Sequence, residues 1–272
     1  MAQAKIIAEK ISRSWPELVI NLVKIRTSGD VNMAAFVNDK PGVKGLFTLE
    51  LEQALMNHEI DFAVHSLKDL PVQINEELPI IAYSEREDPR DALIMKDSGL
   101  VIGSSSLRRR LQIERLLPDS RVIPIRGNIN TRLKKLDEGR ELSGLVLAVS
   151  GLKRLGLEKR ITKIFDISEI LPAPGQGILA CQGRIDEDYC YLECVNNRDS
   201  MDCALAERSF SRSLNAGCNT PVGAYAFVRG GDLTLEGLYI DEDSKEFFRG
   251  SLSGKREDAD SIGKNLSEVI FS

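Results

Sequence analysis

One cysteine of the chain lies in a context that favours covalent chemistry. Cys218 falls in the segment 215–221, between Gly217 and Pro221, and these neighbours predict a loop. A thiol that is exposed on a loop can ionise and form a covalent bond, and a buried, inert cysteine beneath the loop is the alternative. The other cysteines fall in stretches that we expect to be helical or extended, and we interpret them as structural: Cys181, Cys190, Cys194 and Cys203.

Two stretches carry arginines where a predicted strand is followed by a helix. Residues 103–110 are GSSSLRRR, and residues 126–132 are RGNINTR. The first turn of a helix presents unpaired N–H groups to an anion, and arginine forks match carboxylate and phosphate groups. Because ligands of α/β sheets bind beyond the carboxyl ends of the strands, the two stretches predict a site for a ligand with several anionic groups. For the first stretch, the alternative is a serine N-cap followed by surface arginines.

A lysine and an aspartate, Lys68 and Asp69, follow another predicted strand within the segment 65–71. At the carboxyl end of a strand such a pair could supply a charged catalytic group, and a surface ion pair is the alternative. Neither His58 nor His65 stands in a catalytic setting. Because the sequence also lacks a Cys-x-x-Cys pair, we expect no zinc site.

The composition narrows the class of protein. The 272 residues carry a net charge of −5 and suffice for two or three domains. A sequence pI of about 5.3 and the lack of aromatic residues among the arginines of 108–135 argue against a nucleic-acid-binding protein. The sequence shows no apolar run of membrane-spanning length, no secretory signal and no disulfide pattern among its five cysteines. We therefore expect a cytoplasmic protein that does not bind membranes.

The elements that would position these residues alternate between helix and strand, which predicts an α/β architecture. The apolar run 145–149 is typical of a strand that is buried on both faces of a parallel sheet. Segment 171–177, rich in Pro and Gly, is typical of a crossover or a hinge, and three later strands should form an antiparallel meander before a last helix. The expected helices cover residues 4–11, 47–58, 106–117, 129–138 and 200–214, and the expected strands cover residues 18–25, 60–65, 100–103, 121–125, 145–149, 222–228, 233–240 and 246–252.

These motifs, taken in order along nearly the whole chain, resemble the porphobilinogen deaminase (hydroxymethylbilane synthase) family. Each motif is weak alone, whereas the ordered set is specific. The matching residues are 44–47, 65–71, 85–92, 103–109, 126–128, 131–132, 151–156, 175–177 and 217–218.

The resemblance implies a fold of three domains. The first two would be α/β domains built like periplasmic binding proteins, and the third would be a small α+β domain with an antiparallel sheet. We expect the first domain to comprise residues 1–84 with 177–195, the second residues 89–171, and the third, which carries the cofactor, residues 199–272.

The resemblance also implies a transferase that condenses four porphobilinogen molecules head to tail into the linear tetrapyrrole hydroxymethylbilane and releases ammonia. In the family, a dipyrromethane cofactor primes the chain through a thioether bond to a cysteine, which Cys218 matches. Asp69 matches the catalytic aspartate, whose carboxylate would stabilise the cation left when ammonia departs and help to move protons. We expect a monomer that hands its product to the next tetrapyrrole enzyme.

Carboxylate binding is the role that the resemblance gives to most of the remaining site residues, since each porphobilinogen unit carries an acetate and a propionate. Besides Cys218, the cofactor-binding set would comprise Lys68, Ser104, Ser106, Arg108, Arg109, Arg126 and Arg132. The substrate-binding set would comprise Ser66, Arg154, Gln3 and Gln176.

The sequence departs from the family pattern in three places. The usual first strand with its Arg-x-Ser motif is missing, Ser28 stands where an arginine is common, and Leu49 stands where a lysine is common. One alternative is therefore an N-terminally truncated, inactive deaminase. Another is a non-catalytic anion-binding protein of periplasmic-binding-protein-like fold, although that function would have no use for the Cys218 loop.

Overall fold

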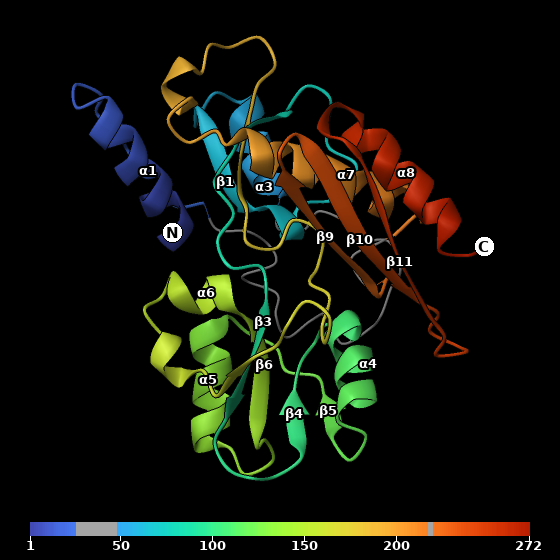
Figure 1. Cartoon of the computed structure of the whole chain (residues 1–272). Helices are drawn as coiled ribbons and strands as arrows, with labels where there is room; N and C mark the ends of the chain where they lie inside the picture. The colour runs from blue at the N-terminus through green and yellow to red at the C-terminus, as the bar shows by residue number, and fades with distance from the viewer. Residues whose placement is uncertain (26–47, 217–219) are drawn as a thin grey trace. The chain divides into compact units, whose positions relative to one another are not determined.

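The computed structural model of the protein describes residues 1–25, 48–216 and 220–272, and they form two compact units (Figure 1). The first unit comprises Met1–Arg86 and Ile178–Met201, and the second comprises Glu87–Gly177 and Asp202–Ser272. Each unit thus combines two stretches that are distant in sequence. Within the described ranges, no helix is both long and apolar enough to cross a membrane.

A three-stranded antiparallel sheet forms the centre of the first unit. Its spatial order is β1 (Phe62–Ser66), β8 (Leu179–Gly183) and β2 (Ile80–Tyr83). The central strand β8 is buried at every residue, because it has a neighbour on each side and side chains packed above and below it. The sheet therefore joins the two stretches of chain that make up this unit.

Two helices, α1 (Ala2–Ser14) and α3 (Leu49–Met56), pack against this sheet. α1 buries Ile7 and Ile11, which lie one helical turn apart, in a cluster with residues of β8 and β1. α3 buries Leu55 in a separate cluster with the intervening residue of β1. Since successive residues of a strand face opposite sides, the two helices cover opposite faces of the sheet.

A five-stranded mixed sheet forms the centre of the Glu87–Gly177 part of the second unit. β4 is parallel to both β5 and β6, whereas β3 is antiparallel to β6 and to β7. β6 is buried at all of its residues, as expected for the run 145–149, and it has one parallel neighbour, β4, and one antiparallel neighbour, β3, so that the sheet is mixed rather than parallel throughout. The strands in spatial order are β5 (Arg121–Ile123), β4 (Val101–Gly103), β6 (Gly144–Ala148), β3 (Asp91–Met95) and β7 (Lys163–Ile164).

Three helices cover this sheet (Figure 1): α4 (Leu107–Leu116), α5 (Ile129–Glu138) and α6 (Val149–Lys153). Val146 of β6 packs in a cluster with Ile113 of α4. The residues on either side of Val146 point the other way and pack in a cluster with α5 and α6. α4 therefore lies on one face of the sheet, and α5 and α6 lie on the other.

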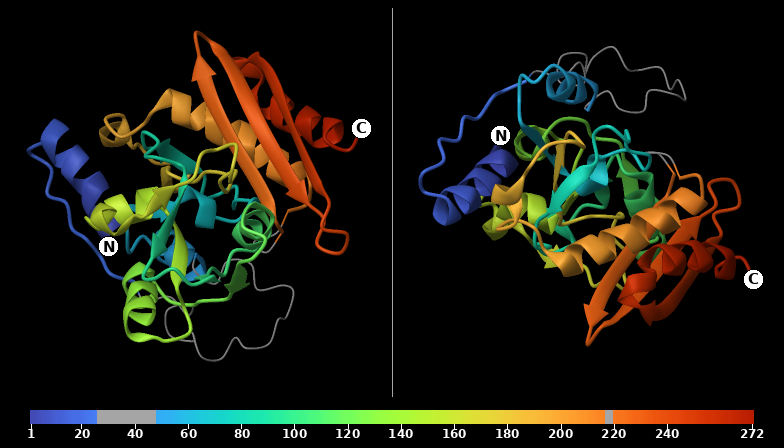
Figure 2. Two further views of the ribbon diagram at one scale, coloured as in Figure 1. Left: turned by 60° about the horizontal axis from the view of Figure 1, so that its bottom comes forward. Right: turned by 90° about the horizontal axis from the view of Figure 1, so that it is seen from above.

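An antiparallel meander of three strands forms the rest of the second unit, with α7 and α8 packed on one face (Figure 2). The two helices approach closely, since a Cβ atom on Gly263 of α8 would lie 2.2 Å from the carbonyl oxygen of Ala206 of α7. The elements are α7 (Arg198–Ser213), β9 (Val222–Arg229), β10 (Asp232–Ile240), β11 (Phe247–Lys255) and α8 (Ala259–Val269), and short 3-10 turns occur at η2 (Glu158–Arg160), η3 (Cys190–Leu192) and η4 (Arg256–Asp258).

The opposite face of the meander packs against the five-stranded part of the same unit. Leu238 and Ile240 of β10 form a buried cluster with Leu111 of α4 and with Leu171. Arg249 of β11 also donates to backbone carbonyl oxygens of the segment that precedes Leu171. These contacts explain why residues 87–177 and 202–272 form one compact unit.

Most of the elements expected from the sequence are present, and the meander is confirmed. The strand expected at 18–25 is wrong: these residues have no strand hydrogen bonds in the described part of the chain, and Val19 and Val23 are exposed. Apolar residues alone do not make a strand where no neighbouring strand is paired with them. The short strands β2, β3, β7 and β8 were not expected. Mixed α/β structure with an antiparallel three-stranded sheet is thus shown.

Candidate functional site

The turn between β4 and α4 is held by its own serines. Ser106 is the N-cap of α4, and its Oγ accepts a hydrogen bond from the backbone N–H of Arg109 at 3.4 Å. The Oγ of the buried Ser104 accepts from the backbone N–H of Ser106 at 3.3 Å. Ser105 Oγ donates to the carbonyl oxygen of Ile125 at 2.5 Å and accepts from its N–H at 3.1 Å. The serine N-cap is therefore confirmed for Ser106, and the turn is tied to the chain that follows β5.

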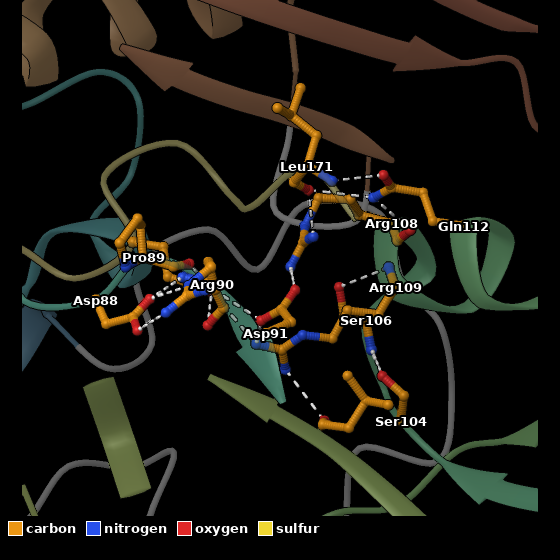
Figure 3. Close-up of polar contacts among 12 residues, drawn as sticks. Asp88, Pro89, Arg90, Asp91, Ser104, Ser106, Arg108, Arg109, Gln112 and Leu171 are labelled. Carbon is orange, nitrogen blue, oxygen red and sulfur yellow. Dashed lines mark hydrogen bonds and ion pairs between the residues drawn. The ribbon is translucent and has the colours of Figure 1, made fainter. Parts of the chain in front are cut away.

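Arg108 and Arg109, in contrast, are not surface arginines. Both are buried, and both bind the fully buried carboxylate of Asp91, the first residue of β3 (Figure 3). Arg108 Nη2 lies 2.8 Å from Asp91 Oδ2, and Arg109 Nη2 lies 2.7 Å from Asp91 Oδ1. Burial by itself raises the pKa of Asp91, but the charges of Arg109 and Arg108 outweigh burial and hold the pKa far below its usual range. Burial lowers the pKa of Arg108, and the charge of Asp91 opposes that shift.

Gln176 is also fully buried and belongs to the same network. Its Nε2 donates to Asp91 Oδ1 at 2.8 Å and to the carbonyl oxygen of Pro89 at 2.6 Å. Its Oε1 lies 3.3 Å from Arg109 Nη2. The structure therefore brings three of the sequence-predicted residues, Gln176 and the two arginines, around a carboxylate for which the sequence predicted no role.

The turn between β5 and α5 presents a second cationic region. Arg126 is exposed, and Gly127 has a φ of +120°, a conformation that favours glycine. Asn128 is the N-cap of α5, with Oδ1 accepting from the backbone N–H of Thr131 at 2.9 Å. The half-buried Arg132 donates from Nε to the carbonyl oxygen of Gly127 at 2.7 Å. The local fold therefore fixes the stem of Arg132 while Arg126 extends into solvent.

Three strand ends bring these turns to one edge of the sheet. β5, β4 and β6 are mutually parallel, so α5, α4 and α6 all begin beyond the same edge. Asp91 lies at this edge too, because it pairs with Ala148, the last residue of β6. Arg154, at the C-cap of α6, donates from Nη2 to the carbonyl oxygen of Gly177 at 2.7 Å. This edge joins helix N-termini with several arginines, which is the arrangement that binds carboxylates.

Segment 171–177 is anchored at both ends within the second unit. The side-chain amide of Gln112 bonds to both backbone groups of Leu171, and Arg108 Nη1 donates to the Leu171 carbonyl oxygen at 2.5 Å. The carbonyl oxygen of Gly177 accepts from the backbone N–H of Glu87 at 3.2 Å. Because the boundary between the two units falls directly after Gly177, both expectations for this segment, a crossover or a hinge, stay predictions.

The first unit carries the other candidate residues in and around η1 (Leu67–Asp69), a 3-10 turn directly after β1. The buried side chains of Leu67 and Leu70 fix this turn to the unit. The turn is therefore a rigid support for Asp69, which is exposed. Lys68 beside it is half-buried. Gln3 of α1 donates from Nε2 to Ser66 Oγ at 2.5 Å, which brings together two of the residues assigned to the substrate.

His65, which precedes these residues in β1, is buried. Burial lowers its pKa to about 4, although a side-chain hydrogen bond with Gln182 acts in the opposite direction. At neutral pH the imidazole is consequently uncharged. The sequence did not predict that His65 is buried.

The five cysteines differ in their surroundings. Cys218 lies outside the described residues, as do Ser28 and residues 44–47. Cys181 and Cys203 are buried, and burial raises the pKa of the Cys181 thiol to about 12, which fits a structural role. Cys190 is exposed, and Cys194 is half-buried with its Sγ 3.3 Å from the carbonyl oxygen of Tyr191.

Family models of porphobilinogen deaminase match most of the chain. The model described as the dipyromethane cofactor binding domain matches residues 1–191, and the model described as the C-terminal domain matches residues 201–272. The porphobilinogen deaminase of Ruminiclostridium josui is 46% identical over 273 residues, covering 99% of this chain and 93% of that protein. The one from Thermus thermophilus is 40% identical over 284 residues, covering 100% of this chain and 91% of that protein. A solved structure of prephenate dehydratase from Arthrobacter aurescens aligns with a TM-score of 0.35 at 12% identity, over 85% of this chain and 77% of that one, which is too low to assign a fold.

Proposed function

Because the chain belongs to the porphobilinogen deaminase family, we propose that it is a transferase that condenses four porphobilinogen molecules head to tail into hydroxymethylbilane. Each condensation releases one ammonia. The match of two family models to residues 1–191 and 201–272 carries this proposal. The gathering of arginines and helix N-termini at one sheet edge supports it, since the substrate and every intermediate chain carry two carboxylates per pyrrole ring.

The dipyrromethane cofactor of the family would be held by a thioether bond to Cys218. When bound, it supplies the pyrrole carbon to which the first substrate unit is joined. The arginines of the second unit suit the carboxylates of this cofactor, because Arg126, Arg132 and Arg154 lie at the sheet edge where three helices begin. Charge-assisted hydrogen bonds from such donors to carboxylates are about twice as strong as neutral ones.

The cofactor carboxylates are assigned to one set of side chains: Lys68, Ser104, Ser106, Arg108, Arg109, Arg126 and Arg132. The porphobilinogen carboxylates are assigned to a second set, Ser66, Arg154, Gln3 and Gln176. Since Ser104 and Gln176 already take part in buried hydrogen bonds, these two would act mainly by holding the turns on which the exposed donors stand.

Asp69 is the proposed catalytic residue. Loss of ammonia from porphobilinogen leaves a cation on the substrate, and a nearby carboxylate stabilises that charge. The same carboxylate can accept a hydrogen bond from a pyrrole N–H and help to remove the proton that is lost when the new carbon–carbon bond forms. The rigid η1 turn supports this role, because a group that stabilises a developing charge must not need to reorganise.

We also propose the finer organisation that the family implies. Residues 1–84 with 177–195 and residues 89–171 would be two domains built like periplasmic binding proteins, and residues 199–272 would be the domain that carries the cofactor. The protein would act as a monomer in the cytoplasm and pass hydroxymethylbilane to the next tetrapyrrole enzyme. Neither nucleic acid nor a membrane has a part in this function.

The decisive experiment is the intact mass of the purified protein before and after incubation with porphobilinogen, together with an assay for hydroxymethylbilane. We expect an added mass equal to two porphobilinogen units less two ammonia, absent from a Cys218→Ser variant. A Cys190→Ser variant, which removes an exposed cysteine instead, should keep the added mass. A bare polypeptide mass after incubation, with no product, would contradict the proposal that this chain is an active deaminase.

A further inference from the structure

Two buried arginines share one buried carboxylate at the sheet edge where α4, α5 and α6 begin (Figure 3). We propose that Asp91 is a positioning residue, which holds the guanidinium groups of Arg108 and Arg109 in place for the carboxylates of the cofactor and of the tetrapyrrole chain that grows on it. Asp91 would not itself touch the substrate. This inference rests on the proposed function and extends it to a residue for which the sequence predicted no role.

The cluster carries one positive charge in excess. Asp91 is 0% exposed, and Arg108 and Arg109 are 4% and 6% exposed. Arg90, the cation nearest to Asp91 in sequence, instead binds both carboxylate oxygens of Asp88, at 2.9 and 2.7 Å. An unbalanced buried charge is unfavourable, and an incoming carboxylate would balance it. The excess positive charge is therefore unfavourable for the stability of the protein alone and favourable for the binding of an anionic ligand.

The hydrogen-bond donors of Arg108 and Arg109 also favour an anionic ligand at this cluster. In the described part of the chain, the buried Nε of Arg108 and that of Arg109 have no hydrogen-bond acceptor. Buried donors without an acceptor are uncommon in native proteins. A carboxylate offers two acceptor oxygens, so a ligand of this chemistry would complete both the charge and the hydrogen bonding of the cluster.

Asp91 is itself held from a second direction, as a positioning residue must be. Gln176 donates to Asp91 Oδ1 at 2.8 Å, and its segment is fixed at Leu171 by Arg108 and Gln112. Loss of the Asp91 charge would leave two like charges side by side with no counter-ion to orient them. In this proposal Gln176 positions Asp91, in place of the direct substrate contact that the sequence suggested.

A second aspartate–arginine pair of the same unit offers a matched control. Arg256 Nε lies 2.7 Å from Asp202 Oδ2, and the Asp202 carboxylate belongs to α7 rather than to a strand of the five-stranded sheet. Asp202→Asn should therefore report what the loss of a largely buried aspartate–arginine pair does to stability alone. Asp91→Asn should have an additional effect on the handling of substrate.

The test compares the full-length holoproteins of the wild type, Asp91→Asn and Asp202→Asn in melting temperature and in the dependence of initial rate on porphobilinogen concentration. We expect Asp91→Asn to raise KM and to lower kcat/KM by about 10- to 100-fold, because a small misplacement of binding groups has effects of this size. Asp202→Asn should keep KM within about twofold of the wild type even where its melting temperature falls. An unchanged or lowered KM in a folded Asp91→Asn protein would overturn the proposal.

Gln176→Leu keeps the inference testable if Asp91→Asn does not fold. It removes one hydrogen bond to Asp91 and leaves both ion pairs, so KM should rise in the same direction by about 2- to 10-fold. A folded Gln176→Leu protein with an unchanged KM would also count against the proposal. A wild type that consumes no porphobilinogen at all would show that the proposed function fails, whereas an active wild type beside an unchanged Asp91→Asn variant would remove only the role of Asp91.

Discussion

Glu207 accepts a hydrogen bond of 2.6 Å from the backbone N–H of Gly175 through its Oε2 atom. Its other carboxylate oxygen accepts from the backbone N–H of Ala226 at 2.7 Å, and the side chain is fully buried. One carboxylate of α7 therefore joins segment 171–177 to strand β9. This link connects the segment that carries Gln176 with the part of the unit that we propose to carry the cofactor.

Glu207→Ala should lower the free energy of unfolding by about 2–6 kcal/mol, because two buried N–H groups would each lose their acceptor at about 1–3 kcal/mol. Urea denaturation measures this change. Glu138→Ala is the control, since that side chain is 68% exposed and its loss should change the free energy by no more than about 0.5 kcal/mol. Equal effects of the two substitutions would contradict the structural role given to Glu207.

His65 should make stability depend on pH in a defined window. Its pKa is lowered to about 4 in the folded protein, against 6.5 for an ordinary histidine. Above pH 6.5 the side chain is neutral in both states, whereas between pH 6.5 and 4 mainly the unfolded chain takes up the proton. Stability should therefore fall as the pH falls through this window, by about 3 kcal/mol in all.

A His65→Gln variant checks this expectation, because it cannot take up that proton. Its free energy of unfolding should decline less steeply between pH 6.5 and 4 than that of the wild type. Parallel curves for wild type and His65→Gln would show that His65 is not the group responsible.

Asp69→Asn should lower kcat by about 100- to 1,000-fold, the usual effect of removing one group that stabilises transition-state charge. KM should change little, because the carboxylates of the substrate are bound by other side chains. Asp61→Asn is the matched control, since Asp61 is exposed just before β1, at the opposite end of the strand from Asp69. Rapid-quench measurement of product formation separates chemistry from release. A wild-type rate in Asp69→Asn would refute the catalytic assignment.

Arg126→Gln should lower kcat/KM by about 10- to 100-fold, the effect expected when a hydrogen bond to a charged group is lost. Arg121→Gln supplies the control, because Arg121 is equally exposed but lies at the start of β5, away from the edge where the helices begin. Steady-state rates at two salt concentrations should also show a weaker salt effect in Arg126→Gln. If both variants lose activity equally, general charge rather than position is responsible.

Local signals were sufficient to predict part of this fold. Helix α5 begins and ends where the sequence indicated, because Asn128 is its N-cap and Gly139 follows its last residue. The meander followed from alternating side chains and Gly-rich turns. The strand expected at 18–25 failed because an apolar run along one segment cannot show whether a second segment pairs with it.

The candidate site, like the fold, could be predicted from the sequence only in part. The rule that ligands bind at strand ends brought the turns at 104–106 and 126–128 to one edge of the sheet, as the parallel register of β4 and β5 shows. The burial of Arg108 and Arg109 was not foreseen, because their partner Asp91 is 17 and 18 residues away in sequence. Periodicity carries no information on such pairings. The roles of these residues in the reaction stay predictions until the variants are measured.

Segment 171–177 behaves as a spacer of fixed length. Its first residue is bound by Gln112, its fifth by Glu207 and its sixth by Asp91. These three contacts fix the number of residues between the attachment points. Inserting one residue there would shift Gln176 or Gly175 away from its partner. The turn at Gly230–Gly231, where an added Cβ would meet nothing within 4 Å, has room for extra residues. Relatives of this chain should therefore differ in length at the hairpin between β9 and β10 and agree in length across segment 171–177.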